Sequence, residues 1–156
     1  IGVGTTMLLH CDLIYAAENT RFSVPFVNLG LVPEAGSSLL MPRLAGHPRA
    51  MEKLWFGDLF DAQEALGMGL INQILPAGEV LSKATAQAER LAALPLGSVM
   101  GTKQLARSSP LVQQTLAQID EEAKWFIQRV QGPATREAIA AFKAKRKPDF
   151  THMAGE

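Results

Sequence analysis

The chain has 156 residues, of which 47% are hydrophobic, so it can bury one sizeable core and we expect one domain with at most an appended subdomain. Its 15 Lys and Arg residues balance its 15 Asp and Glu residues, which argues against a nucleic-acid partner. No apolar run approaches the roughly 20 residues that cross a bilayer, so we expect no membrane partner.

The first part of the chain is predicted to alternate short helices and strands. A glycine-rich turn at Gly2–Gly4 leads into a short buried helix at Thr5–Leu9. Strands are predicted at Asp12–Ala17, where apolar residues dominate, and at Arg21–Val24, where they alternate with polar residues. Gly, Pro, Asn and Ser punctuate residues 26–40 and predict a loop, and loops often carry functional residues.

Start and stop signals define the next two helices. One helix is predicted at Pro48–Phe56, because Pro favours a first turn and Gly57 is typical of a helix end. Asp61–Glu64 has the spacing of a capping box, which predicts a second helix that ends at Gly67 or Gly69.

Beyond a last predicted strand at Leu70–Leu75, the chain is predicted to be helical. Apolar residues recur at helical spacing from Val80 onward. Further helices are predicted at Val99–Arg107, Leu111–Val130 and Ala134–Lys145. We therefore predict an α/β part, residues 1–94, followed by a helical region, residues 95–156.

Cysteine and histidine are few. Cys11 is the single cysteine, and it has no metal-ligand spacing with His10, His47 or His152, so we expect no bound metal. Cys11, His10 and His47 are assigned to packing or to the surface. A lone cysteine cannot form an internal disulfide, which favours a reducing compartment, and we expect a cytoplasmic protein.

The turn at Gly2–Gly4 has two interpretations. The backbone N–H groups at the start of a helix have no partner within the helix and carry partial positive charge, so they can bind an anion or an oxyanion. Short glycine clusters are common, however, and an ordinary tight turn before a helix explains the same pattern.

Glu34 is the only carboxylate in the predicted loop, residues 26–40. Its sequence neighbours are apolar or small, and a carboxyl group in such surroundings suits a general base. A solvated loop glutamate, or a carboxylate that stabilises the start of the following helix, explains the residue as well.

Short motifs occur in a fixed order along almost the whole chain. In chain order they are Gly2-Val3-Gly4 with Cys11-Asp12, Phe22 with Pro25, Leu29-Gly30 with Pro33 and Gly36-Ser37-Ser38, Leu44 with Gly46, Gly57 with Ala62 and Ala65, Gly69-Leu70-Ile71, and Phe142 with Lys145-Arg146-Lys147-Pro148 and Phe150. As an ordered set they resemble the crotonase superfamily, the enoyl-CoA hydratases and isomerases. The resemblance corresponds to the last three-fifths of such an enzyme, so we expect the C-terminal portion of a longer enzyme that is cut within its active site.

The resemblance implies a fold, an assembly and a ligand. We expect an α/β protein with the incomplete C-terminal part of a crotonase-type ββα spiral core, followed by an α-helical trimerisation region that covers the acyl-CoA site. Members of the superfamily form homotrimers or hexamers and act on acyl-CoA thioesters. Coenzyme A is then part of the substrate, and no separate cofactor is expected.

The resemblance also implies catalytic roles. Val3 matches the residue whose backbone N–H donates to the thioester oxygen in the oxyanion hole, while the second donor lies outside the matched part. The two glutamates of the family's hydratases correspond to Thr6 and Phe26, which cannot activate a water molecule. Glu34 matches the single acid of the Δ3,Δ2-enoyl-CoA isomerase-like branch, so it is the predicted general base.

Enoyl-CoA isomerisation is therefore the favoured function. In this reaction a C=C bond shifts by deprotonation at C2 and reprotonation at C4, through an enolate held in the oxyanion hole. The alternatives are another reaction of the family, such as hydration, dehalogenation, thioester hydrolysis or decarboxylation, and a catalytically silent homologue that binds acyl-CoA.

Residues around the catalytic groups are predicted to bind the substrate. The acyl-thioester end is expected to contact Gly2, Gly4, Pro25, Phe26, Leu29, Val32 and Pro33. Phe26, Leu29 and Val32 would keep the pocket dry, although core packing explains Leu29 and Val32 equally well. Coenzyme A is expected to contact Phe126, Phe142 and Lys145. The nearby Lys143, Arg146 and Lys147 are better explained as cations of a solvated helix end.

Overall fold

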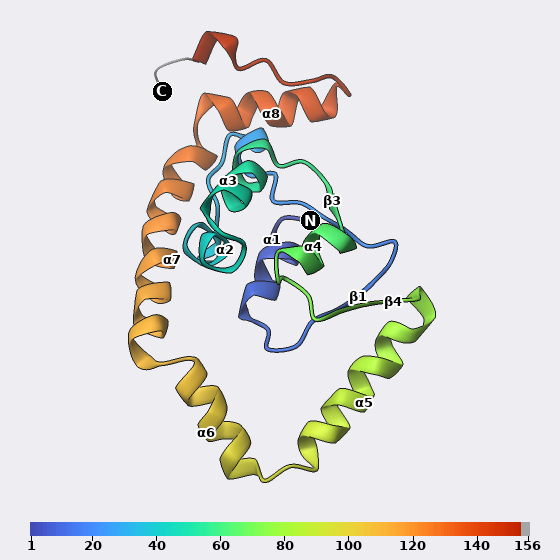
Figure 1. Ribbon diagram of the computed structural model, residues 1–156. Helices are drawn as coiled ribbons and strands as arrows, with labels where there is room; N and C mark the ends of the chain where they lie inside the picture. The colour runs from blue at the N-terminus through green and yellow to red at the C-terminus, as the bar shows by residue number, and fades with distance from the viewer. Residues whose placement is uncertain (154–156) are drawn as a thin grey trace.

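The computed structural model describes residues 1–153 and contains two small sheets in the first half of the chain (Figure 1). In one sheet, β1 (Tyr15–Ala17) pairs in parallel with β4 (Gln73–Leu75), with their first residues opposite each other. In the other, β2 (Arg21–Phe22) pairs antiparallel with β3 (Phe60–Asp61), and two aromatic rings stack with centroids 5.5 Å apart. Both pairings join segments that are far apart in the sequence.

The parallel strands are shorter than the sequence predicts. Strands were expected at Asp12–Ala17 and Leu70–Leu75, but only the last three residues of each belong to the ladder. Just before it, the Asn72 N–H donates to the Ile14 carbonyl, and the Asn72 side-chain oxygen accepts from the Ile14 N–H, each at 2.7 Å. The asparagine side chain thus replaces a ladder bond, which local apolar content does not predict.

Capping signals predict two helices correctly. α3 (His47–Phe56) ends at Gly57, which has a φ of 64° and is the predicted stop. α4 (Ala62–Gly67) begins with the predicted capping box, in which the Glu64 N–H donates to the Asp61 carboxylate at 2.9 Å. These predictions hold because the capping bonds join residues only a few positions apart.

The predicted loop at residues 26–40 is wrong in part, because it contains η2 (Val27–Leu29) and the start of α2 (Ser37–Ala45). Three of the residues that suggested a loop lie inside or at the ends of these helices: Asn28 lies in η2, Gly30 is its C-cap, and Gly36 is the N-cap of α2. Pro42, beyond the predicted loop, lies within α2. α2 buries Met41 and packs against α3 and α7. This packing outweighs the backbone hydrogen bond that is lost at Pro42.

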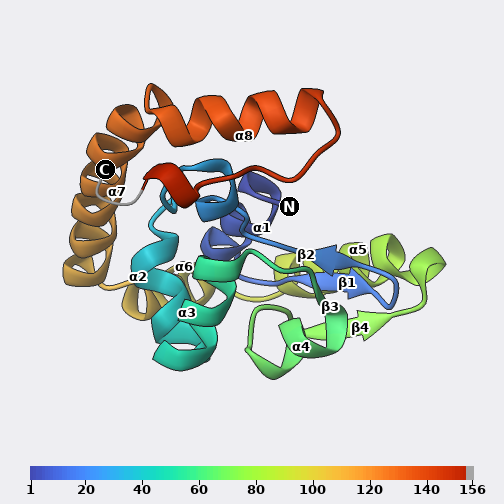
Figure 2. The ribbon, with the colours of Figure 1, turned by 90° about the horizontal axis from the view of Figure 1, so that it is seen from above.

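The N-terminal helix and the second half of the chain follow the predicted pattern closely. α1 (Val3–Thr6) continues into η1 (Met7–His10) where a short buried helix was expected, but the expected burial holds only for Thr5 and Thr6, since η1 buries no residue and Met7 is exposed. After β4 the described chain consists of η3 (Ala77–Glu79), α5 (Val80–Ala92), α6 (Leu96–Ala106), α7 (Ser109–Val130), α8 (Pro133–Lys143) and η4 (Thr151–Met153). α5 and α6 diverge from the sheets, α7 runs beside α2, and α8 lies across η2 (Figures 1 and 2).

Two hydrophobic clusters form the core. One comprises Ala16, Phe22, Phe60, Ala62, Ala65, Met68, Leu70 and Ile71. The other comprises Val24, Phe26, Met41, Ala50 and Leu54.

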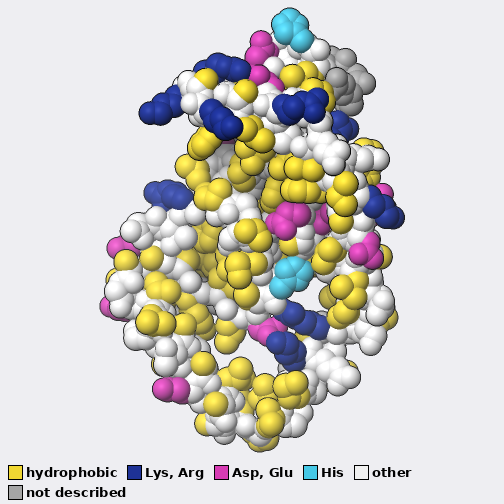
Figure 3. All heavy atoms as spheres, turned by 180° about the vertical axis from the view of Figure 1, so that it is seen from behind, with side chains coloured by type: hydrophobic (Ala, Val, Ile, Leu, Met, Phe, Trp, Pro, Cys, Tyr) yellow, Lys and Arg dark blue, Asp and Glu magenta, His cyan; other side chains and the backbone are white. Residues whose placement is uncertain are grey.

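α5 and α6 bury no residue, and hydrophobic side chains cover the lower part of the face in Figure 3, where these helices lie. Lys103 of α6 and Arg107, which follows it, both form ion pairs with Asp12.

No helix within residues 1–153 has both the length and the apolar character needed to cross a membrane.

Gly30 allows α8 to pack closely on η2. Its φ is 70°, and a Cβ atom there would lie 2.6 Å from the Thr135 nitrogen and 2.7 Å from the Ala134 carbonyl carbon. Such a distance cannot be relieved by a side-chain rotation, so α8 would have to move. We expect Gly30→Ala to lower the free energy of unfolding by about 2–4 kcal/mol, combining left-handed strain with overpacking.

Gly69→Ala is the matched control for this prediction. Gly69 also has a positive φ, 79°, but a Cβ there makes only an ordinary contact, at 3.6 Å from the Leu44 side chain. Its expected cost is therefore strain alone, about 1–2 kcal/mol. Urea denaturation measures both variants, and equal losses would show that α8 does not depend on the close approach at Gly30.

Candidate active site

Glu34 lies in the turn between η2 and α2, and its carboxylate contacts the first helix of the chain. The Thr6 hydroxyl donates a hydrogen bond to Glu34 Oε1. Thr6 is fully buried, while Glu34 is half-buried, and no described residue donates a hydrogen bond to its other oxygen, Oε2. The carboxyl group is thus held through one oxygen and available through the other.

The glycine turn lies one helical turn from this contact. Gly2 has a φ of 58° and donates its N–H to the Ser23 carbonyl at 2.9 Å, which fixes the start of α1. The Gly4 N–H donates to the Ile1 carbonyl at 3.2 Å. Within residues 1–153 no group accepts a hydrogen bond from the Val3 N–H, and the Val3 side chain is exposed. The structure therefore brings the N–H predicted for the oxyanion hole and the predicted base to the same helix.

The backbone that carries Glu34 is strained and heavily bonded. Ala35 and Gly36 have φ values of 59° and 71°, a left-handed conformation that costs about 1–2 kcal/mol for alanine. The Glu34 carbonyl accepts from the Ser37 hydroxyl at 2.6 Å, and the Ala35 carbonyl lies 2.7 Å from His10 Nε2. A residue in this conformation persists only where its surroundings fix it, so these bonds set the direction of Glu34.

The predicted acyl-pocket residues have different surroundings. Phe26 is buried in the core beside Val24 and Met41. Leu29 is 43% exposed on η2, and Pro25, Val32 and Pro33 are half-buried. The core packing that was considered for Leu29 is therefore not observed, whereas it accounts fully for Phe26.

The predicted coenzyme A contacts lie on α7 and α8. Phe126 is half-buried on α7, and Phe142 on α8 is 83% exposed. Lys145 follows α8 with a φ of 52° and is exposed. No hydrogen bond or ion pair within the described residues joins these three to Glu34.

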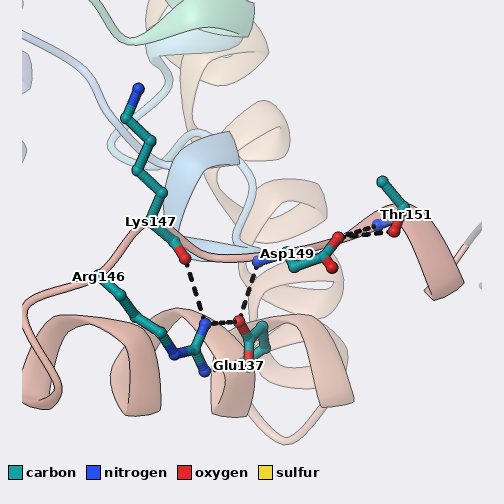
Figure 4. Close-up of polar contacts among 5 residues, drawn as sticks. All are labelled: Glu137, Arg146, Lys147, Asp149 and Thr151. Atoms are coloured by element: carbon teal, nitrogen blue, oxygen red, sulfur yellow. Dashed lines mark hydrogen bonds and ion pairs between the residues drawn. The ribbon is translucent and has the colours of Figure 1, made fainter.

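One of the basic residues beyond α8 is held by an acidic partner (Figure 4). Arg146 donates to both oxygens of Glu137, at 2.5 Å and 2.9 Å, and the Asp149 N–H donates to Glu137 at 2.9 Å. The Lys147 side chain points away from this cluster (Figure 4). Dark-blue Lys and Arg side chains gather over this end of the molecule in Figure 3.

The sequence profile of the family described as enoyl-CoA hydratase/isomerase matches residues 1–153. The chain belongs to this family. The result confirms the resemblance to the crotonase superfamily, and the described residues form an incomplete crotonase-type fold.

Solved and curated relatives of the enoyl-CoA hydratase/isomerase family support this result. A crystal structure of an enoyl-CoA hydratase/isomerase from Pseudoalteromonas atlantica T6c is 39% identical, with a TM-score of 0.92 over 96% of this chain and 60% of that one. The 1,2-epoxyphenylacetyl-CoA isomerase of Escherichia coli (strain K12) is 35% identical, over 96% of this chain and 57% of its own. A "Probable enoyl-CoA hydratase" of Rhizobium meliloti (strain 1021) is 32% identical, over 97% of this chain and 59% of its own. The chain thus spans about three-fifths of the length of these relatives.

The structure assigns contacts to three residues that sequence analysis did not connect with Glu34. Thr6 was considered only as a replacement for a hydratase glutamate, and His10 was assigned to packing or to the surface. Glu122, on α7, accepts hydrogen bonds from the backbone that follows Glu34. No local signal identifies these residues, because they lie 24 to 88 positions from Glu34 in the sequence.

We expect the Thr6 hydroxyl and the Glu34 carboxylate to be energetically coupled. Thr6→Val keeps the side-chain shape but removes the donor, and should lower the free energy of unfolding by about 1–2 kcal/mol. A double-mutant cycle with Glu34→Ala, measured by urea denaturation, should give a coupling energy of about 1 kcal/mol. Strict additivity of the two losses, within about 0.3 kcal/mol, would contradict the contact.

The contacts of Glu137 with Arg146 and Asp149 should weaken as the pH falls from 4.5 toward 2. The hydrogen bond from Arg146, together with that from the Asp149 N–H, lowers the pKa of Glu137 from 4.5 to about 2. Because folding favours the anion, its stabilising effect is complete above pH 4.5 and is lost as the pH falls toward 2. The protection factor of the Asp149 amide, measured by NMR hydrogen exchange, should decrease over this interval.

Glu137→Gln should reduce the same protection factor already at pH 7. Lys147→Ala is the control, because it keeps the backbone carbonyl that accepts from Arg146 at 3.1 Å and should change nothing. Equal protection of Asp149 in wild type and Glu137→Gln would show that this anion does not hold the segment after α8.

Proposed function

We propose that this chain is part of an enoyl-CoA isomerase-like enzyme that moves a C=C bond into conjugation with a thioester. The observation that carries the proposal is the single carboxyl group of Glu34, held through one oxygen by Thr6 beside the helix that begins at Val3. In the resemblance to the crotonase superfamily, a lone acid at this position belongs to the isomerase-like branch.

In the proposed mechanism Glu34 acts as a proton shuttle. Its free oxygen, Oε2, removes a proton from C2 of the substrate, while Oε1 stays bonded to the Thr6 hydroxyl. The Val3 N–H donates to the enolate oxygen, a contribution of about 3–4 kcal/mol by analogy with other oxyanion holes. The same carboxyl group then returns the proton to C4.

Exclusion of water follows from this mechanism. The enolate must be protonated by Glu34 and not by solvent, so the acyl chain requires an apolar surrounding. Val32 and Pro33 directly precede Glu34 in the chain, and Leu29 lies five residues before it. All three are proposed to contact the acyl chain, together with Pro25 and the two glycines of the first turn. Phe26 supports this region from the core.

The remainder of the substrate is proposed to lie along the helical region. Phe142 and Lys145 are exposed, so they are available to contact the nucleotide end of coenzyme A, and the half-buried Phe126 of α7 is proposed as a further contact. Coenzyme A is part of the substrate, and we propose that the reaction uses no separate cofactor and no metal. The active assembly is proposed to be a homotrimer or a hexamer.

Hydration is the second candidate function, because several relatives carry hydratase names, including the 2,3-dehydroadipyl-CoA hydratase of Escherichia coli (strain K12). Against it, the hydratase glutamates correspond to Thr6 and Phe26. Phe26 is buried in the core, and Thr6 already bonds Glu34. Neither side chain can act with Glu34 as the second acid or base that activates a water molecule.

Isomerisation is tested by the absorbance of the conjugated thioester that forms from a β,γ-unsaturated acyl-CoA. In the complete gene product, Glu34→Gln should lower kcat by about 10²- to 10⁴-fold, because the amide cannot accept the C2 proton. Glu52→Gln, the same change at an exposed glutamate of α3, should leave kcat unaltered.

Three outcomes would contradict the proposal. Equal background rates for wild type and Glu34→Gln, with acyl-CoA still bound, would identify a catalytically silent homologue. Addition of water to crotonyl-CoA that persists in Glu34→Gln would show that other residues carry the chemistry. Measurable turnover by the 156-residue chain alone would show that no second oxyanion donor from outside it is required.

A further inference from the structure

We propose that Glu122 of α7 is a positioning residue that aims the Glu34 carboxyl group by holding the backbone that follows it. This inference rests on the proposed function of Glu34. Glu122 is only 6% exposed, and it is the one charged residue among those buried in the described part of the chain. A carboxylate that is removed from water requires hydrogen-bond donors from the protein, and the position of these donors indicates which part of the structure it stabilises.

All the donors of Glu122 come from the start of α2. The Gly36 N–H donates to Glu122 Oε2 at 2.6 Å. The Ser38 N–H and the Ser38 hydroxyl both donate to Oε1, at 3.0 Å and 2.5 Å. Gln118, one turn earlier on α7, donates to the Ser38 hydroxyl at 2.9 Å. Glu122 therefore satisfies N–H groups that a helix start leaves without partners.

No cation contributes to this arrangement. Within residues 1–153, Glu122 forms no ion pair with a Lys or Arg side chain, and its hydrogen-bond donors are polar groups at the start of α2. The contact joins residues 86 positions apart, so it depends on α7 lying beside α2 (Figure 1). The helical region thereby reaches the turn that carries the proposed base.

The contact can direct Glu34 because only Ala35 separates that residue from Gly36. Ala35 and Gly36 have φ values of 59° and 71°, and alanine does not favour this conformation. Without the anchor at Gly36, Ala35 can relax to a negative φ, which changes the direction of the Glu34 side chain. A displacement of about 1 Å at a catalytic group can cost about 10²-fold in rate.

The test uses Glu122→Gln in the complete gene product. The glutamine amide has one acceptor oxygen, which can still accept the hydrogen bonds from Ser38. Its NH2 group then faces the Gly36 N–H, so two donors oppose each other and that hydrogen bond is lost. We expect kcat for isomerisation to fall about 10- to 100-fold while KM changes less than about threefold, since the acyl-CoA contacts stay in place. Hydrogen exchange of the amides of residues 34–38 should become faster.

Glu121→Gln is the matched control, since Glu121 is the neighbouring glutamate of α7 and, among the described residues, pairs only with Lys124 and Trp125 on the same helix. It should match wild type in kcat and in hydrogen exchange. Glu122→Asp keeps two acceptor oxygens and should recover part of the activity that Glu122→Gln loses. Ser38→Ala removes one of the donors with little structural change, and should lower kcat by a smaller factor, about 3- to 10-fold.

All rates are compared at a temperature at which melting curves show every variant folded. A fall in melting temperature with unchanged kcat for both Glu122→Gln and Ser38→Ala would overturn the inference, because Glu122 would then only stabilise the fold. If Glu34→Gln is inactive in the same assay, the proposed function stands even when the inference fails. If wild type itself does not isomerise the substrate, the proposed function fails and the inference fails with it.

Discussion

The left-handed turn Glu34–Gly36 is the constraint on which the candidate active site depends. Two successive residues with positive φ, one of them alanine, are stable only where neighbouring groups fix them. The bonds come from three elements: His10 of η1, Ser37 of α2 and Glu122 of α7. With Thr6 fixing the side chain as well, the direction of the Glu34 carboxylate is determined by parts of the chain that meet only in the folded protein.

Polar and close backbone contacts join the helical region to the α/β part, in addition to apolar packing in which α8 buries Ala138 and Ala141. α6 contacts the segment after η1 through Asp12, α7 holds α2 through Glu122, and α8 approaches η2 where Gly30 leaves room. α5 and α6 bury no residue and keep hydrophobic side chains exposed. Hydrogen bonds depend on direction, so these attachments fix the orientation of the helices more than apolar contacts would.

Relatives of this chain in the enoyl-CoA hydratase/isomerase family carry both isomerase and hydratase names, so the fold alone does not fix the reaction. In the proposed assignment, hydration requires two acids around a water molecule, whereas isomerisation requires one acid that carries a proton between two carbons. By the resemblance to the crotonase superfamily, Thr6 corresponds to one hydratase acid, and in the structure its hydroxyl binds Glu34. In the proposed assignment, the residue at the position of one acid therefore orients another.

The sequence by itself determined the features that depend on neighbouring residues. Gly57 and the Asp61–Glu64 box predicted helix ends correctly, and Glu34 was identified as the lone acid of its segment, because caps and composition act over a few positions. Tertiary structure decided which residues meet. Glu121 and Glu122 are the same residue type side by side in the sequence, yet one is exposed and the other is buried against Gly36. Only the packing of α7 on α2 makes the two glutamates differ in burial, and a contact between residues 86 positions apart produces no pattern in the local sequence that could predict it.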